Sequence, residues 1–174
     1  MIHYDTEIKE FKIRFAERKD AALILTFIKE LAEYENLSEE VVATDELLEN
    51  TIFDQQKCEV IIGEYKNIPV AFALFFHNFS TFLGRPGIFL EDLFVKPEYR
   101  GLGIGTLLLA FLAKLTKERS CGRLEWNCLD WNEPSIQFYK KLGAVPMDSW
   151  TTYRVHNDAL NALASRWELQ EKIE

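Results

Sequence analysis

Three glycines at every second position mark the part of the chain best suited to bind an anion. They lie in "RGLGIG", residues 100–105, between an apolar strand-like run and an apolar helical pattern. A helix N-terminus presents unpaired N–H groups and the positive end of the helix dipole. Glycines before it let the backbone curl so that several N–H groups face one anion. The loop therefore predicts a phosphate or pyrophosphate site, where Arg100 could contact phosphate oxygens or tie the loop down.

Two common phosphate-binding patterns do not match this loop. A Walker loop needs a Gly-Lys dipeptide, and the chain contains none. The dinucleotide pattern fails because Leu108 stands where its third glycine would be. A flexible turn without a ligand is the remaining alternative. Three spaced glycines weaken a chain that has no use for them, which favours a ligand.

Two neighbouring acids interrupt the apolar run "FLEDLFV", residues 89–95. Successive side chains of a strand point to opposite faces, so we expect Glu91 and Asp92 on different sides of the sheet. Burying a charge without a partner is costly. At least one carboxylate should therefore face a cleft, and the alternative for either is a structural ion pair.

Tyr139, in "FYKKLG", is a candidate proton donor. When an amine attacks a thioester, the amine must lose a proton and the departing thiolate gains from an acid. A tyrosine, with a reference pKa of about 10, can supply that proton. The alternative is a packing role on an amphipathic helix, as expected for the adjacent Phe138.

Alternating and helical patterns predict the elements that position these residues. Strands are expected at 11–16, 58–65, 68–79, 87–95, 123–130 and 150–156, and those at 58–65 and 68–79 should form a hairpin around Lys66 and Asn67. Helices are expected at 19–35, 44–53, from the glycine loop to 119, at 133–143 and at 158–173, with Thr44 as an N-cap. This order indicates a single-domain mixed α/β or α+β fold around one central sheet flanked by helices. Residues 1–10 are expected to form a leader, 11–156 the domain and 157–174 a helical tail.

The composition of the chain disfavours several classes of binding partner. The 174 residues carry a formal net charge of -8, which disfavours nucleic acid as a partner. Three cysteines, none of them in a C-x-x-C pair, favour free thiols over disulfides or zinc, and the histidines share no metal spacing. We expect no metal. No signal peptide and no apolar run of about 20 residues is present, so we expect a cytoplasmic protein without a membrane partner.

Longer motifs resemble one enzyme family. "RGLGIG" after "LFVKPEY" resembles the acetyl-CoA loop of the GNAT superfamily of N-acetyltransferases. "FLEDLFVKPEYRGLGIG", "DWNEPSIQFYKKLGA" and "IKELAEYE" resemble its spermidine/spermine (diamine) acetyltransferase branch, including relatives that act on thialysine. The resemblance covers about residues 11–156. It implies the GNAT fold, acetyl-CoA as cosubstrate, a small-molecule amine as acceptor and a homodimer.

The resemblance also implies roles for individual residues. Tyr139 would be the general acid, and Glu91 would lie at the amine site as a catalytic residue. The residues expected to hold acetyl-CoA are Leu93, Phe94, Val95, Arg100, Gly101, Leu102, Gly103, Ile104, Gly105, Thr106, Asn132 and Ser135. The residues expected at the acceptor are Tyr34, Glu35, Glu91, Asp92 and Trp150. For Tyr34 and Glu35 the alternative is a solvated helix end.

Three functions remain open on the sequence. The first is acetylation of a small cationic amine, either a diamine or polyamine or a lysine-like amine. The second is acetylation of protein lysines or N-termini on the same fold. The third is a non-catalytic CoA-binding regulatory module, against which the combination of Tyr139, Glu91 and the glycine loop argues.

Overall fold

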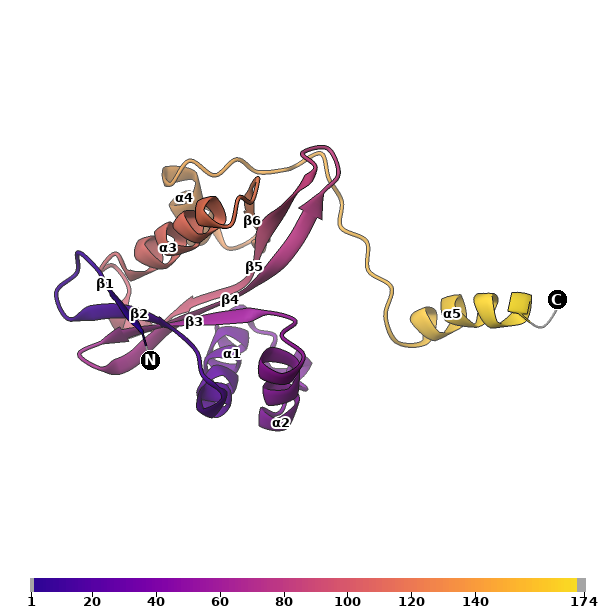
Figure 1. The fold of residues 1–174 in the computed structure, drawn as a ribbon, viewed down its shortest axis with the longest axis horizontal. Coiled ribbons are helices and arrows are strands. Elements are labelled where there is room, and N and C mark those ends of the chain that lie inside the picture. Colours follow the sequence, from indigo (N-terminus) through magenta and orange to yellow (C-terminus); the bar gives the residue numbers. More distant parts are fainter. Residues whose placement is uncertain (1, 172–174) are drawn as a thin grey trace. The chain divides into compact units, whose positions relative to one another are not determined.

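Six strands form one sheet, in which they are arranged side by side in the order of the sequence (Figure 1). The computed structural model describes residues 2–171, and the sheet belongs to the first of two units, which ends at Asn132. Neighbouring strands are antiparallel except for β5 and β6, which are parallel. The strands are β1 His3–Asp5, β2 Phe11–Phe15, β3 Glu59–Tyr65, β4 Ile68–Ser80, β5 Arg85–Val95 and β6 Leu124–Trp126.

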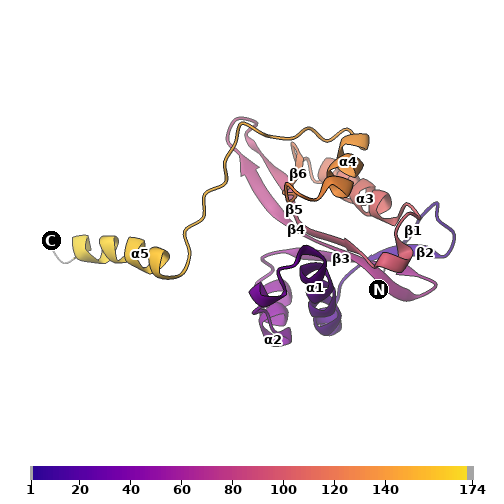
Figure 2. The same ribbon diagram turned by 180° about the vertical axis from the view of Figure 1, so that it is seen from behind.

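Helices cover both faces of this sheet (Figures 1 and 2). On one face lie α1 (Ala21–Glu35) and α2 (Asp45–Leu48), and on the other lies α3 (Ile104–Glu118). A buried apolar cluster joins α1 to the sheet, with the Phe27 and Phe72 rings stacked 5.2 Å apart. Burial of such apolar surface is the main stabilising contribution in a domain of this size. Both layers hold β5 and the glycine loop in place.

The hairpin predicted around Lys66 and Asn67 is confirmed. These two residues connect β3 to β4 with φ values of 53° and 63°. Positive φ at both central residues is the geometry of a type I′ turn, which suits the twist of two antiparallel strands. The Thr44 cap is also confirmed, since its side chain accepts a hydrogen bond from the Leu47 N–H.

Several element boundaries differ from the expectation. Residues 3–5 of the expected leader form β1, which pairs with β2, so this part of the leader belongs to the sheet. The helix expected at 44–53 continues beyond α2 as a π-helix over Glu49–Asp54. β6 has three residues because it pairs with β5 only at Ile88, Phe89 and Leu90.

The second unit begins at Glu133 and contains two helices. They are α4, Glu133–Lys141, and α5, Asn157–Glu171. Gly143, with φ +86°, follows α4, and its N–H donates to the Lys140 carbonyl. The strand expected at 150–156 was wrong: these residues form no strand within the described chain. An alternating pattern needs a neighbouring strand to accept its backbone groups, and the pattern alone does not provide one.

The helices in the described range, 2–171, include none that is long and apolar enough to span a membrane.

Candidate active site

The glycine loop has the backbone geometry that its sequence predicts. Gly101 and Gly103 have φ values of +78° and +86°, in the left-handed region that favours glycine. Gly103 is the N-cap of α3, and Ile104 is the first helical residue. A side chain added at Gly101 would meet no atom within 4 Å. The N-terminus of a 15-residue helix is therefore reached through open, uncrowded backbone.

Arg100 ties this loop to its neighbours. Its Nε donates a hydrogen bond to the Val95 carbonyl oxygen at 2.9 Å. The guanidinium carbon lies 4.6 Å from the ring centre of Tyr34 and 5.6 Å from that of Phe94. Cation–π contacts at these distances are attractive. The sequence left two roles open for Arg100, a contact with phosphate oxygens or an anchor for the loop. In the structure Arg100 is the anchor, because it joins the glycine loop to β5 and α1.

An open edge runs along the second half of β5. Beyond Leu90, no strand of the described residues pairs with β5 on its β6 side. The opposite side remains paired with β4, where Leu74 faces Asp92 and Phe75 faces Leu90. Backbone groups of residues 91–95 that point to the β6 side, other than the Val95 carbonyl that accepts from Arg100, are therefore available to a ligand. This stretch contains Leu93, Phe94 and Val95, the residues expected to meet the cosubstrate through their backbone.

A β-bulge lies at Glu91. The register passes from Leu90 to Asp92 against adjacent residues of β4, so Glu91 is the extra residue. A bulge kinks the strand and redirects its side chains, which strict alternation does not anticipate. Glu91 is exposed and Asp92 is half-buried. The two acids therefore differ in exposure, and their placement on opposite faces of the sheet stays a prediction.

Three carboxylates lie close enough to influence one another at this bulge. Burial, and then the charges of Glu91 and Glu35, raise the pKa of Asp92 to about 6. Burial also raises the pKa of Glu35. No cation of the described chain is among the charges that act on Asp92. We call Glu35, Glu91 and Asp92 the acid cluster.

The raised pKa of Asp92 predicts a stability effect. The folded state holds the proton more tightly than an ordinary carboxylate with a pKa of 3.8, so the wild type loses stability as pH rises from about 4 to about 6. Asp92→Asn removes this loss. We expect the variant's free energy of unfolding at pH 7 to exceed that of the wild type by on the order of 1–2 kcal/mol.

Denaturant unfolding at several pH values measures this difference, which should shrink towards zero near pH 4. Glu98→Gln is the matched control, because Glu98 is exposed, does not act on Asp92, and an exposed substitution normally changes stability by about 0.5 kcal/mol or less. An Asp92→Asn protein less stable than wild type at pH 7 would contradict the assigned environment of Asp92.

Tyr34 connects α1 to the segment that follows β6. Its hydroxyl donates to Asn132 Oδ1 at 3.2 Å, and its ring centre lies 6.3 Å from that of Trp131. A predicted acceptor residue and a predicted cosubstrate residue, Asn132, therefore touch each other. Cys128 belongs to the same neighbourhood, since burial and then the charges of Glu35 and Asp130 raise the pKa of its thiol. The sequence reading assigned Cys128 no part in the site, and no motif around it pointed to one.

The remaining predicted residues lie on the second unit. Ser135 and Tyr139 are four residues apart on α4 and so share one face of that helix. The Phe138 and Tyr139 rings lie 5.3 Å apart. Trp150 lies after α4 and is exposed. Their roles towards acetyl-CoA and the acceptor stay predictions from the sequence.

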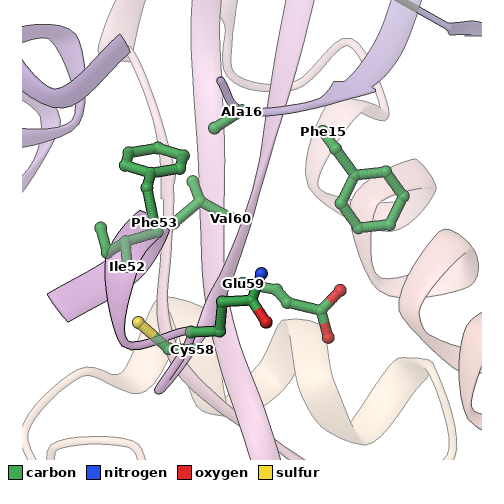
Figure 3. A pocket seen from close by; sticks show the side chains of 8 residues that line it. Phe15, Ala16, Ile52, Phe53, Cys58, Glu59 and Val60 are labelled. Carbon is green, nitrogen blue, oxygen red and sulfur yellow. The ribbon is translucent and has the colours of Figure 1, made fainter. Parts of the chain in front are cut away.

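A separate pocket of about 420 Å³ lies where β2 ends and β3 begins (Figure 3). None of the predicted site residues lines it. Glu59 points into this region, but its carboxylate is held by Arg119, whose Nη2 lies 2.7 Å from Glu59 Oε2. Cys58 lines the pocket and lies near the acid cluster. Burial, and then the charges of Glu59, Asp92 and Glu91, raise the pKa of the Cys58 thiol. The pocket offers mainly apolar side chains, namely Phe15, Ala16, Ile52, Phe53 and Val60.

The side chains that the structure describes, those of residues 2–167, include no group of three or more histidine, cysteine, aspartate or glutamate arranged to hold a metal ion.

Comparison with known proteins agrees with this geometry. The model of the acetyltransferase (GNAT) family matches residues 25–144, more than half of the chain. The chain belongs to the GNAT family. The matched region continues across the boundary at Asn132, so residues of both units contribute to a single-domain GNAT fold.

Relatives of this GNAT protein include one named as an amine acetyltransferase and one named as resembling such an enzyme. A thialysine N-epsilon-acetyltransferase of Bos taurus is 35% identical over 166 residues, covering 88% of this chain and 97% of the bovine protein. A human spermidine/spermine N(1)-acetyltransferase-like protein is 31% identical over 175 residues, or 94% of this chain and 25% of the human protein. Among solved structures, an integron cassette protein of V. cholerae superposes with a TM-score of 0.76 at 26% identity, covering 89% of this chain and 98% of that one.

Proposed function

We propose that this GNAT protein transfers the acetyl group of acetyl-CoA to a primary amine of a lysine analogue or a diamine-like acceptor. The observation that carries the proposal is the acid cluster at the open edge of β5. Burial and the charges of Glu91 and Glu35 raise the pKa of Asp92 there, and no cation is among the groups that act on Asp92. Such a site attracts an acceptor that brings ammonium groups. The names of the relatives, which act on thialysine or belong with spermidine/spermine acetyltransferases, support the same acceptor class.

Each part of the site has a task in this reaction. Acetyl-CoA supplies an acetyl group activated as a thioester. The backbone N–H groups of the glycine loop and the α3 N-terminus suit its pyrophosphate. The acid cluster draws in the ammonium group, and Asp92, ionised for the most part above pH 6, can take up the proton that the amine must lose. Tyr139 is assigned the proton that the leaving thiolate gains.

Turnover against an amine panel tests this function. Diamines should outrank monoamines of equal length, with lysine-like amines between them, because a second ammonium gains attraction from the acid cluster. The rate should rise between about pH 7 and 9 as the neutral form of an amine with a pKa of about 10 becomes available. A protein that binds acetyl-CoA but acetylates no amine would instead be a non-catalytic CoA-binding module.

The Glu91→Gln variant, assayed against the same amines, tests whether Glu91 recognises the second ammonium group. Removing one charge should lower kcat/KM for a diamine by roughly five- to tenfold more than for a neutral-tailed monoamine, since only the diamine carries a second charge for Glu91 to attract. Equal losses for both acceptors would show that Glu91 does not distinguish them. A monoamine that outranks every diamine would exclude the diamine class.

We also propose that the protein is a homodimer, following the family resemblance. Light scattering at micromolar concentration should give twice the chain mass of 20.3 kDa. A dilution series down to nanomolar concentration provides the comparison, because association depends on concentration. A mass of 20.3 kDa throughout would contradict the dimer and leave the catalytic proposal unaffected.

A further inference from the structure

The glycine loop carries no basic side chain of its own. Residues 101–106 contain no lysine or arginine. Arg100 immediately before them is engaged with the Val95 carbonyl and with the Tyr34 and Phe94 rings. The phosphates of coenzyme A are strongly anionic, and the protein as a whole carries a formal net charge of -8. A cation from another segment would offset this unfavourable field.

The segment that connects β1 to β2, residues 6–10, lies against the glycine loop. The Ile8 Cδ1 atom is 3.6 Å from the position that a Cβ atom on Gly103 would take, which is a van der Waals distance. Figures 1 and 2 show this indigo loop beside the loop that precedes α3, in both views. We call residues 6–10 the N-terminal loop.

Hydrogen bonds and ring contacts fix the N-terminal loop. The Thr6 hydroxyl donates to the Phe11 carbonyl at 2.9 Å, and the Phe11 N–H donates to the Ile8 carbonyl at 3.0 Å. The strand before it is anchored to α3, because the Tyr4 ring lies edge-on to Phe111 at 5.0 Å. The loop is therefore positioned by the same helix whose N-terminus faces the expected phosphates.

Lys9 is the one cation of the N-terminal loop, one residue from the Ile8 contact. Its side chain is exposed. Neighbouring lysines are paired, Lys12 with Asp5 and Lys66 with Glu10. No ion pair joins Lys9 to a carboxylate in the part of the chain that the structure describes.

We propose that the N-terminal loop forms one wall of the cosubstrate site and that Lys9 binds a phosphate of coenzyme A. The inference rests on the proposed function, because it assumes acetyl-CoA at the glycine loop. Lys9 lies within reach of that loop through Ile8 and is free to turn towards an anion. A lysine acts on phosphate as a mobile point charge, so an exposed position suits it.

Calorimetric titration of the full chain with coenzyme A tests the proposal. Lys9→Ala should weaken binding by about three- to tenfold and Lys9→Glu by more, whereas Lys9→Arg should stay within about twofold. Lys114→Ala is the matched control, because it removes the same charge from α3 about 15 Å beyond the helix start, where Lys114 pairs with Glu118. Its affinity should equal that of the wild type.

Dephospho-coenzyme A identifies the phosphate. If the Lys9→Ala loss disappears with this ligand, Lys9 binds the 3′-phosphate, and if the loss persists, Lys9 binds the pyrophosphate. Unchanged affinities of Lys9→Ala and Lys9→Glu in a protein that binds coenzyme A would overturn the inference alone. A wild-type protein that binds no coenzyme A and acetylates no amine would instead overturn the proposed function.

Discussion

Tyr139→Phe is expected to lower kcat by roughly 10²–10⁴, the usual range for loss of a general acid, while the KM values for both substrates change little. The substitution removes one hydroxyl and keeps the ring that contacts Phe138, so packing within α4 is preserved. A loss confined to kcat is the sign of a group that acts in the transition state. Steady-state kinetics with saturating diamine and acetyl-CoA measure it.

Tyr153→Phe supplies the comparison for this experiment. Tyr153 lies in the same unit, is 90% exposed and is assigned no role, so its hydroxyl should be dispensable. Circular dichroism and thermal melts of both variants should match the wild type. If the Tyr139→Phe protein kept near-complete activity, Tyr139 would be a packing residue. The leaving thiolate would then take its proton from solvent.

Gly103→Val is expected to raise the apparent KM for acetyl-CoA by about tenfold or more. The residue has φ +86°, which a β-branched side chain strongly disfavours, so the loop must shift. Hydrogen bonds from backbone N–H groups to a charged ligand contribute roughly 1.5–3 kcal/mol each, and losing one good contact accounts for a tenfold change. The KM for the amine should remain near its wild-type value.

Gly84→Val separates this effect from general destabilisation. Gly84 also has a positive φ, +63°, and no neighbouring atom lies within 4 Å of its Cβ position, but it belongs to the β4–β5 turn. Both valines should therefore impose similar backbone strain. If both variants raised the KM for acetyl-CoA equally, the glycine loop would lose its assignment as the phosphate site.

Local chemistry made much of the fold predictable. The Lys66–Asn67 turn, the Thr44 cap and the left-handed glycines each depend on neighbours in the sequence, and all three appear as expected. The bulge at Glu91 was not predictable in this way, because it arises from the register between β4 and β5. β1 has three residues, too few for a recognisable alternation.

In the candidate site, too, local features were predictable from the sequence and contacts between distant segments were not. Residue types indicated a phosphate loop and a carboxylate that faces a cleft. A motif resemblance indicated the amine acceptor and the residues that take each role. The structure adds the proximity of the acids, since it brings Glu35 on α1 close enough to Asp92 on β5 for its charge to raise the pKa of Asp92. It also turns Arg100 towards Tyr34. Contacts between segments far apart in the chain depend on the folded layers, and no local pattern contains them.

The unpaired edge of β5 beyond Leu90 has a consequence for how such a protein diversifies. Contacts made there use main-chain groups, which are the same whatever residue occupies a position. If acetyl-CoA binds at this edge and the acid cluster selects the amine, as proposed, the choice of acyl donor is largely insulated from substitution, whereas the choice of amine rests on a few carboxylates. A lineage could exchange those carboxylates and adopt new acceptors while it keeps the same donor, so the two halves of the reaction can evolve at different rates.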